Sequence, residues 1–361
     1  MIVCVDGVSL TRPLSGIGRV AFEICRRLVN CQDISRLIVA CPGPLNVAFK
    51  EIETYTQIRR CGRNTWYGLH LSRLLHNCDP DIFFSPSHRV PVTTPRHTFK
   101  HIMVHDLVWA KLPETMRPFA RFYEPILFRH AVKQADHITA VSKSTANDLL
   151  EAFPGISDKV SISPLASSFV EQGRQKSGDY ILFVGTFEPR KNIPYLLDGY
   201  ANLPDEIKKD FELVLAGADS WGHVDVSKEI RNRNLQNFVS LKKEPTEKQL
   251  IQLYKNCAFL VLPSLYEGFG LPIVEAMSFG KPVITSNISS LPEVAGQAGL
   301  LVNPYEPNQM TQAMHALLTD GNLYLKLSDH ALQRSKSFTW DHISSDLVQN
   351  FRRSVEQSQK N

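Results

Sequence analysis

The sequence predicts an α/β protein made of two Rossmann-like domains that face a cleft. Short apolar runs alternate with amphipathic helical stretches along the chain, which is typical of parallel sheets covered by helices. This series occurs twice, and the polar residues 166–178 between the two series read as a linker. The 361 residues also suffice for two domains that each have a core. In such sheets, ligands bind at the carboxyl ends of the strands.

The first series predicts a domain at residues 1–165. Its strands should be short apolar runs, because a parallel sheet is covered on both faces. They are expected at Ile2–Val5, Arg36–Ala40, Ile82–Ser85, His101–Val104, His137–Val141 and Val160–Ser163. The helical segments between them include Gly18–Leu28, Pro118–Gln134 and Lys143–Glu151.

The second series predicts a domain at residues 179–339, followed by a C-terminal helix at residues 340–361. The strands are expected at Tyr180–Val184, Glu212–Ala216, Val239–Leu241, Phe259–Leu262, Pro282–Thr285 and Gly299–Val302. The last helical stretch, Trp340–Gln357, has no strand after it.

The composition indicates a globular protein with reduced thiols. Hydrophobic residues make up 43% of the chain and charged residues 21%, as in soluble globular proteins. No apolar run approaches the roughly 18 residues that cross a bilayer, and no signal-peptide pattern is present. The seven cysteines form no Cys-x-x-Cys pair, which argues against a disulfide framework or a zinc site. We therefore expect a cytoplasmic protein.

The charge is distributed unevenly along the chain. Residues 1–170 carry 20 Lys and Arg against 14 Asp and Glu, whereas residues 171–361 carry 20 against 22. This difference indicates that the two domains have different partners. The basic excess is modest and no nucleic-acid motif accompanies it, so we expect no nucleic-acid partner.

The most informative motif, at residues 266–277, reads as a glycine-rich loop that runs into a helix. Gly268 and Gly270 allow the backbone to turn sharply and to approach a ligand closely. Two carboxylates, Glu267 and Glu275, stand eight positions apart at this junction. They could therefore face the same ligand.

The same loop predicts a phosphate site at the start of the helix. The free N–H groups of Phe269, Gly270 and Leu271 would lie at the positive end of the helix dipole. With Glu267 and Glu275 on either side, the arrangement suits the pyrophosphate and the flanking hydroxyls of a nucleotide sugar. The alternative is an ordinary helix whose first turn carries acidic residues to match its dipole.

This segment resembles the donor-binding signature of family-4 retaining glycosyltransferases of the GT-B fold. The resemblance rests on Glu267, which opens the string Glu-Gly-Phe-Gly-Leu-Pro, and on Glu275 eight positions later. The resemblance implies transfer of a hexose from a nucleoside-diphosphate sugar to a hydroxyl, with retention at the anomeric carbon. It implies that Glu267 binds the sugar and Glu275 the ribose. By analogy with GT-B proteins, the C-terminal helix would cross back to the first domain.

A basic pair follows the first strand of the second domain, in the segment Phe183–Asn192. Arg190 and Lys191 could neutralise a diphosphate leaving group, and the segment resembles the pyrophosphate-binding loop of the same family. Many members carry an arginine directly after the glycine, where this chain has Thr186. We therefore assign the arginine role to Arg190. The alternative is a pair of solvated surface charges.

A second glycine motif, Gly16-Ile17-Gly18-Arg19-Val20-Ala21, matches the dinucleotide fingerprint. A dinucleotide site also needs an acidic residue at the end of the second strand, which ends Val39–Gly43 without one. The resemblance instead places Gly16 and Gly18 beside the donor phosphates or the acceptor. An ordinary strand-to-helix turn is the alternative.

A histidine, His105, follows the expected strand His101–Val104 at its carboxyl end. It could hydrogen-bond the donor sugar or the departing oxygen, and Asp106 could orient it. In related enzymes a histidine at such a place lies near the transferred sugar, which implies that role here. The alternative is a structural histidine beside a capping aspartate.

One motif suggests a metal site but lies in the wrong place. Asp79-Pro80-Asp81 is an Asp-x-Asp string, which metal-dependent glycosyltransferases of another fold use to hold Mn²⁺ or Mg²⁺. Here it precedes the strand Ile82–Ser85, at the entry end of that strand. We therefore expect no metal and no other cofactor.

Some further segments have two open interpretations. Polar segments at strand ends could line the ligand site or be ordinary loops: Ser85–Arg89, Asp219–His223, Ser289–Glu293 and Asn303–Pro304. Segments rich in basic and aromatic residues, Arg59–Tyr67 and Arg117–Lys133, could rest on an anionic lipid surface or pack on their own sheet.

Together these features predict a retaining hexosyltransferase whose first domain binds the acceptor and whose second domain binds the nucleotide sugar. A resemblance to bacterial O-antigen transferases favours mannose from GDP-mannose, with UDP sugars still open. The acceptor would be a glycan or a polyprenyl-linked sugar at the cytoplasmic face of the inner membrane. The expected catalytic residues are His105, Arg190, Lys191 and Glu267. The expected donor-binding residues are Gly16, Gly18, Arg190, Lys191, Glu267, Gly268, Phe269, Gly270, Leu271 and Glu275.

Two other function classes remain open from the sequence. One is a nucleotide-sugar epimerase or hydrolase on the same fold, which would turn over the donor without an acceptor. The other is a non-catalytic protein that binds sugar nucleotides, which would bind a donor but transfer nothing.

Overall fold

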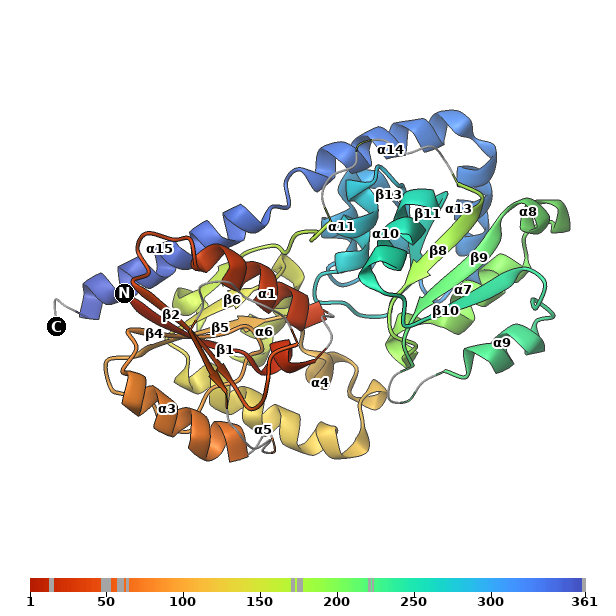
Figure 1. Ribbon diagram of the computed structural model, residues 1–361. Coiled ribbons are helices and arrows are strands. Elements are labelled where there is room, and N and C mark those ends of the chain that lie inside the picture. The colour runs from red at the N-terminus through yellow and green to blue at the C-terminus, as the bar shows by residue number, and fades with distance from the viewer. Residues whose placement is uncertain are drawn as a thin grey trace. The chain divides into compact units, whose positions relative to one another are not determined.

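The computed structural model describes residues 1–12, 16–46, 53–56, 62, 65–169, 173, 178–219, 222 and 224–358, with the backbone alone at 53–56 and 357–358. The chain divides into two units, each built around one parallel sheet (Figure 1). The first unit comprises Met1–Leu107, Phe122–Leu165 and Thr339–Asn361. The second unit comprises Val108–Arg121 and Ala166–Phe338.

In the described part of the first unit, seven parallel strands form one sheet in the order β3-β2-β1-β4-β5-β6-β7. The order reverses between β1 and β4, and α/β proteins bind ligands at the carboxyl ends of strands beside such a reversal. The six strands expected from the sequence are confirmed. β3 is an addition, because its residues Glu-Thr-Tyr-Thr form no apolar run. The strands are β1 (Ile2–Asp6), β2 (Arg36–Cys41), β3 (Glu53–Thr56), β4 (Ile82–Ser85), β5 (Phe99–Val104), β6 (His137–Ala140) and β7 (Val160–Ile162).

Helices cover both faces of this sheet, with α1 and α15 on one face and α3 and α5 on the other (Figure 1). The three helices expected at Gly18–Leu28, Pro118–Gln134 and Lys143–Glu151 are confirmed. The bounds are α1 (Gly16–Leu28), α3 (Leu71–Cys78), α5 (Pro118–Gln134), α6 (Lys143–Ala152) and α15 (Trp340–Ser358). Short turns of 3-10 or π helix lie at η1 (Val8–Thr11), η2 (Trp66–His70) and η4 (Ser157–Lys159).

In the described part of the second unit, six parallel strands have the order β10-β9-β8-β11-β12-β13, with the reversal between β8 and β11. All six expected strands are confirmed, and most boundaries agree within two residues. The strands are β8 (Tyr180–Val184), β9 (Glu212–Gly217), β10 (Val239–Lys243), β11 (Phe259–Leu262), β12 (Val283–Ser286) and β13 (Gly299–Val302). Two Rossmann-like domains, as the sequence predicts, are therefore the fold of this chain.

The second unit contains mostly short helices that follow its strands. Those grouped with it are α4 (Val108–Lys111), η3 (Pro113–Thr115), η5 (Pro189–Lys191), α7 (Ile193–Ala201), α8 (Asp205–Asp210), α9 (Val226–Asn232), α10 (Glu247–Asn256), α11 (Leu271–Ser278), α12 (Leu291–Ala295), η6 (Gly296–Ala298), α13 (Pro307–Thr319) and α14 (Gly321–Ser335).

The unit boundaries differ in detail from the expected domain boundaries. Residues 108–121 group with the second unit although they lie inside the expected first domain. The described residues of the expected linker also group with the second unit, while residues 170–172 and 174–177 lie outside the described residues. Of the basic segment Arg59–Tyr67, residues 59–61, 63 and 64 lie outside them as well.

The C-terminal helix α15 belongs to the first unit and covers the middle of its sheet. Phe351 is fully buried, and its ring centroid lies 5.4 Å from that of His101 and 6.0 Å from that of Phe84. An ion pair of 2.6 Å between Arg27 and Asp341 ties the start of α15 to α1. The helix is therefore held to this unit by buried apolar side chains, among them Phe351 with its aromatic contacts.

None of the helices in the described residues is long and apolar enough to cross a membrane.

The aromatic anchor of α15 yields a stability prediction. Phe351→Ala should lower the free energy of unfolding by about 3–5 kcal/mol, because it leaves a cavity between α15 and the sheet. Phe122→Ala is a matched control in the same unit, since Phe122 is 77% exposed, and should change stability by less than about 0.5 kcal/mol. Urea unfolding followed by circular dichroism measures both, and equal losses would contradict the role of Phe351.

Candidate functional site

The strongest cluster of polar side chains lies where the strand order of the second sheet reverses. β8 and β11 are hydrogen-bonded neighbours, with Ile181 opposite Phe259 and Leu182 opposite Leu260. The loops that leave these two strands at their carboxyl ends carry the basic pair and the glycine-rich motif. The backbone N–H of Leu265 donates to the carbonyl of Arg190 at 2.7 Å, which joins the two loops directly.

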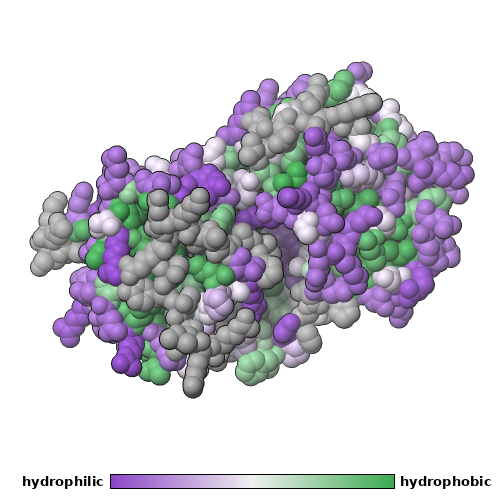
Figure 2. Space-filling model, viewed as in Figure 1, coloured by the Kyte–Doolittle hydropathy of each residue, from purple (hydrophilic) through white to green (hydrophobic). Residues whose placement is uncertain are grey.

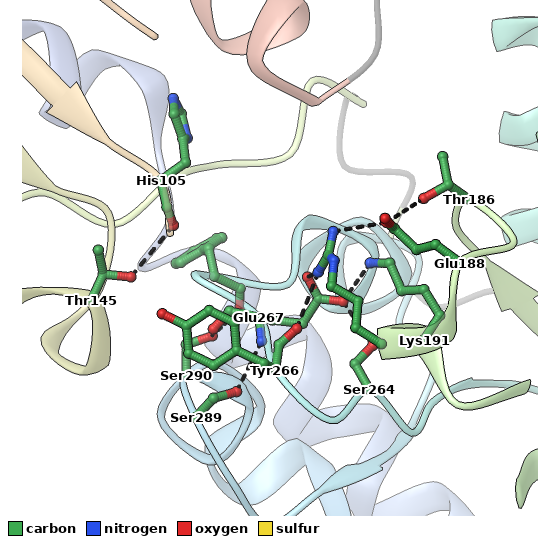
Figure 3. A network of polar contacts seen from close by, with 12 residues as sticks. His105, Thr145, Thr186, Glu188, Lys191, Ser264, Tyr266, Glu267, Ser289 and Ser290 are labelled. Carbon is green, nitrogen blue, oxygen red and sulfur yellow. Dashed lines mark hydrogen bonds and ion pairs between the residues drawn. The ribbon is translucent and has the colours of Figure 1, made fainter. Parts of the chain in front are cut away.

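Glu267 lies at the centre of this cluster (Figure 3). One carboxylate oxygen, Oε1, accepts hydrogen bonds from the Lys191 ammonium and, at 2.7 Å, from the Ser264 hydroxyl. The other oxygen, Oε2, accepts from the Arg190 guanidinium at 2.8 Å. Glu267 and Lys191 are both only 7% exposed, so this is a buried ion cluster. The structure thus brings Arg190, Lys191 and Glu267 together, from positions far apart in the sequence.

Arg190 is also held by one residue of the glycine-rich loop and by one residue of its own loop. Its guanidinium donates to the carbonyl of Tyr266 at 3.1 Å and to the carboxylate of Glu188 at 3.0 Å. Glu188 in turn accepts a 2.6 Å hydrogen bond from the Thr186 hydroxyl. Thr186, the residue that departs from the family pattern, therefore anchors the acid that orients Arg190.

The charges of this cluster depend on one another. Burial by itself would raise the pKa of Glu267, but Lys191 and Arg190 more than offset this effect and lower the pKa to about 2. Burial lowers the pKa of Lys191, and the attraction of Glu267 opposes that change. Glu267 is therefore a fixed negative charge at neutral pH that needs both cations beside it.

Two serines hold the backbone of the glycine-rich loop. The N–H of Glu267 donates to the Ser289 hydroxyl at 3.1 Å. The Ser290 hydroxyl is placed within hydrogen-bonding distance of two carbonyls, 2.9 Å from that of Glu267 and 3.0 Å from that of Phe269. Both serines belong to the segment Ser289–Glu293, one of the polar segments singled out in the sequence.

The loop ends in a left-handed residue that starts helix α11. Gly270 is the N-cap of α11 with φ of +103°, a conformation that residues with a side chain rarely adopt. Within the described residues, the amides of Phe269, Gly270 and Leu271 donate no hydrogen bond to a protein group. Three N–H groups therefore remain available at the positive end of this helix.

Glu275, the second carboxylate of the motif, lies inside α11 and is 5% exposed. Its Oε2 accepts a 2.6 Å hydrogen bond from the hydroxyl of Tyr254 on α10. Glu267 faces the basic pair, whereas Glu275 is engaged with a neighbouring helix. The expectation that both glutamates bind a donor therefore remains a prediction.

The first unit carries the other expected site residues. His105 follows β5, and its Nε2 lies 2.7 Å from the carbonyl of Pro86. A carbonyl only accepts, so Nε2 carries the proton and Nδ1 is left as an acceptor. Burial lowers the pKa of His105, which keeps the ring neutral at neutral pH. The Pro86 carbonyl thus accepts a hydrogen bond that orients the ring, and the charge of Asp106 opposes the lowering of the His105 pKa.

A buried carboxylate at the reversal of the first sheet was not expected from the sequence. Asp6 ends β1, is 1% exposed, and accepts hydrogen bonds from Tyr67 at 2.6 Å, Ser87 at 3.0 Å, Ser85 at 3.3 Å and the N–H of Val8 at 3.1 Å. Burial raises its pKa, although these hydrogen bonds oppose the change. The sequence signal was an acid directly after a buried strand, before a glycine.

The remaining expected residues of the first unit lie at the start of α1 and in the segment after β4. Gly16 and Gly18 lie in the first turn of α1, and Gly16 has φ of +40°. In the segment Ser85–Arg89, Arg89 binds both carboxylate oxygens of Glu124, at 2.6 and 2.7 Å. In the second unit, residues 220, 221 and 223 of the segment Asp219–His223 lie outside the described residues.

The two aspartates of the Asp-x-Asp string have structural roles in the first unit. Asp81 accepts a 2.6 Å hydrogen bond from the N–H of Ile2, and Asp79 is the left-handed C-cap of α3. Among the residues that the structure describes, no group of three His, Cys, Asp or Glu side chains is arranged to hold a metal ion.

Two family models match this chain, one in each half. The model described as "Glycosyltransferase Family 4" matches residues 14–165. The model described as "Glycosyl transferases group 1" matches residues 167–334 and includes the whole ion cluster. Between them the two models span most of the chain.

Curated relatives and solved structures are similar over nearly the whole length. The O-antigen chain mannosyltransferase B of Escherichia coli is 27% identical, over 93% of this chain and 95% of the relative. The serotype-specific mannosyltransferase WbdA of Escherichia coli is 27% identical over the whole chain, which spans about half (49%) of that longer relative. The crystal structure of Anabaena HepE in complex with UDP and glucose has a TM-score of 0.75 at 17% identity, over 97% of this chain and 99% of HepE.

The ion cluster predicts how stability responds to acid. The folded pKa of Glu267, about 2, is below its ordinary value of 4.5, so its contribution is present above pH 4.5 and is lost as the pH falls toward 2. The loss should be on the order of 3 kcal/mol. Urea unfolding between about pH 3 and pH 6 measures it.

Two variants make this test specific. Glu267→Gln should be less stable at neutral pH and should show a flatter dependence on pH in the acid range. Glu206→Gln, which changes an exposed glutamate on α8, should keep the wild-type dependence. An unchanged slope for Glu267→Gln would show that the cluster does not depend on this carboxylate.

Proposed function

Since this chain is a family-4 glycosyltransferase of the GT-B fold, we propose that it transfers mannose from GDP-mannose to a hydroxyl of a glycan or lipid-linked acceptor, with retention of the anomeric configuration. The product would be part of a cell-surface polysaccharide such as O-antigen. On this proposal, the second unit binds the nucleotide sugar and the first unit binds the acceptor.

The observation that carries the proposal is the Arg190–Glu267–Lys191 cluster beside the start of α11. A diphosphate leaving group needs cations and oriented N–H donors where its negative charge develops. Arg190, Lys191 and the free amides of Phe269–Leu271 are such groups, and they lie at the strand reversal where this fold binds ligands. We assign the diphosphate to these donors and the sugar to Glu267.

On this proposal, His105 of the first unit interacts with the transferred sugar. Its Nε2–H is used by the Pro86 carbonyl and its ring is neutral, so it has no proton to give to a leaving oxygen. Its Nδ1 is an acceptor. We therefore propose that His105 accepts a hydrogen bond from a sugar hydroxyl and positions the donor.

The proposed mechanism relies on electrostatic stabilisation and positioning. Reaction on one face of the sugar would let the departing phosphate help to deprotonate the acceptor hydroxyl, while Arg190 and Lys191 stabilise the developing charge. No step is assigned to a metal, because two fixed cations already occupy the position beside the diphosphate. The carboxylate of Asp81 is engaged with the N–H of Ile2, and that of Asp79 lies 3.4 Å from Nε2 of His97.

The choice of mannose and of GDP rests on similarity. Two relatives, both from Escherichia coli, are named as mannosyltransferases, one of them of the O-antigen chain. The HepE structure, which shares the fold, is a complex with UDP and glucose, so a UDP sugar is the competing donor. A cytoplasmic location at the inner membrane follows from the proposed lipid-linked acceptor.

The proposal is tested by incubating the protein with GDP-mannose or a UDP-hexose and a panel of mannose-containing oligosaccharides. We expect mannose transfer from GDP-mannose that continues in EDTA, and NMR spectra that show the donor's anomeric configuration in the product. Inversion would contradict the stereochemistry. Release of the nucleotide at the full rate without an acceptor would indicate a hydrolase or an epimerase. Donor binding without turnover would indicate a binding protein.

The role of the basic pair can be tested by comparing a substitution of Lys191 with the same substitution of another buried lysine. Lys191→Met should lower the transfer rate by roughly 100-fold to 1,000-fold, because it removes a cation beside the leaving diphosphate. Lys208→Met is the control, since Lys208 is also buried and paired with an acid, Asp205 at 2.9 Å, but lies on α8. Steady-state kinetics of both variants separate the site from a general loss of a buried lysine. Equal rates would exclude Lys191 from catalysis.

A further inference from the structure

A groove on the second unit lies between helices α7 and α13, which pack against each other on one face of its sheet (Figure 1). Its volume is about 550 Å³, within the range of roughly 300–1,000 Å³ of small-molecule sites. The residues that line it include Asp198, Asn202, Tyr305, Glu306 and Asn308. None of the lining residues belongs to the loops after β8 and β11, so the groove is separate from the ion cluster.

The largest side chain of the groove is the aromatic ring of Tyr305. Among the described residues of 166–338, three large apolar residues are exposed, and Tyr305 at 70% exceeds Leu301 at 45% and Leu325 at 49%. On the face that Figure 2 shows, the surface of the second unit is mainly hydrophilic, with small hydrophobic areas between the hydrophilic residues. The groove thus combines one flat aromatic surface with hydrogen-bonding groups on a largely polar unit.

The loop that carries Tyr305 is fixed by hydrogen bonds. The backbone N–H of Tyr305 donates to Oδ1 of Asn303 at 3.1 Å, and the Asn303 amide donates to the Glu306 carboxylate at 2.7 Å. The other oxygen of that carboxylate accepts from Gln309 at 2.7 Å. From α7, the Tyr195 hydroxyl donates to the carbonyl of Asn303 at 2.8 Å. A ring on a loop that is already ordered loses less conformational entropy when a ligand binds.

The other polar groups of the groove are available to a ligand. Asp198 accepts a 2.6 Å hydrogen bond from Arg233 at Oδ1, and no described residue donates to its Oδ2. The side-chain amides of Asn202 and Asn308 and the hydroxyl of Tyr305 make no hydrogen bond to another described residue. A carboxylate oxygen accepts hydrogen bonds, and each amide both donates and accepts. Together these groups can bind several hydroxyls at once.

We propose that this groove binds a neutral glycan. A sugar ring has C–H groups on its faces, which the negative face of the Tyr305 ring attracts, and hydroxyls at its edge, which the carboxylate of Asp198 and the two amides bind. No lysine or arginine is among the described residues that line the groove, whereas Asp198 and Glu306 are acids, so an anionic ligand would be repelled. The proposal goes beyond the proposed function, because binding here needs neither the ion cluster nor sugar transfer.

A fluorescent side chain in the groove tests the proposal directly. The full-length Tyr305→Trp variant keeps an aromatic ring at this position and is titrated with linear tetrasaccharides of mannose, glucose or galactose, and with tetragalacturonic acid as an anionic glycan. The wild type is titrated in parallel, so that binding elsewhere in the protein is subtracted. We expect a saturable change in fluorescence with at least one neutral glycan and none with the anionic one. No change with any neutral glycan, or an equal change with the anionic one, would overturn the proposal.

Substitution of the two amides tests the polar part of the groove. Asn202→Ala with Asn308→Ala, made in the Tyr305→Trp variant, should weaken binding of the neutral glycan by at least roughly fivefold, because hydrogen bonds to its hydroxyls are lost. Both asparagines are exposed, so circular dichroism should not change.

An asparagine outside the groove provides the matched control. Asn322→Ala, made in the same Tyr305→Trp variant, removes an exposed amide from α14. It should leave the affinity for the neutral glycan unchanged. If Asn322→Ala weakens binding as much as the substitution of the two groove asparagines, or if that double substitution has no effect, the proposal is wrong.

Transfer to a disaccharide acceptor separates this proposal from the proposed function. Tyr305→Ala should keep the wild-type transfer rate with such an acceptor, because Tyr305 lies outside the ion cluster. Glycan binding by the Tyr305→Trp variant of a protein that transfers no sugar would contradict the proposed function alone. Sugar transfer without a fluorescence change in that variant would contradict this proposal alone.

Discussion

The buried ion pairs of Glu267 are the interaction on which the site of the second unit depends. The carboxylate comes from the loop after β11, and its cations, Arg190 and Lys191, come from the loop after β8. Removing one member of a buried ion cluster leaves a charge without compensation, which is strongly destabilising. The cluster therefore fixes the two loops to each other at the strand reversal, and the position of α11 follows from that link.

The two sheets share a topology but use their buried carboxylates differently. Asp6 in the first unit and Glu267 in the second both lie at the carboxyl end of a strand beside the reversal. Hydroxyls and an amide surround Asp6, and burial raises its pKa. Cations surround Glu267, and its pKa falls to about 2. Asp6 thus organises neighbouring loops of its unit, whereas Glu267 supplies a permanent charge.

Local patterns in the sequence predicted most of the fold and part of the site. Among the residues that the structure describes, twelve strands are short apolar runs that the sequence predicted, whereas β3 lacks such a run and was missed. The spacing of Glu267 and Glu275 and the adjacent Arg190 and Lys191 were readable as motifs. Their contacts were not, because the partners of a side chain depend on packing between distant segments. Tyr254 on α10 and Ser264 carry no sequence signal that connects them with these glutamates.

The balance of charge in the cluster constrains how the proposed donor site works. Arg190 and Lys191 contribute two positive charges, and Glu188 and Glu267 contribute two negative charges beside them. The four groups are therefore close to neutral together, so they attract a diphosphate weakly by net charge. What they provide is fixed geometry, because each cation is already held by hydrogen bonds before a ligand arrives. Thr186 belongs to this arrangement, since its hydroxyl holds Glu188 against Arg190. In chains with arginine at that position, a third cation would replace this support. If the proposed function holds, the site therefore depends more on the free amides at the start of α11 for its attraction to phosphate.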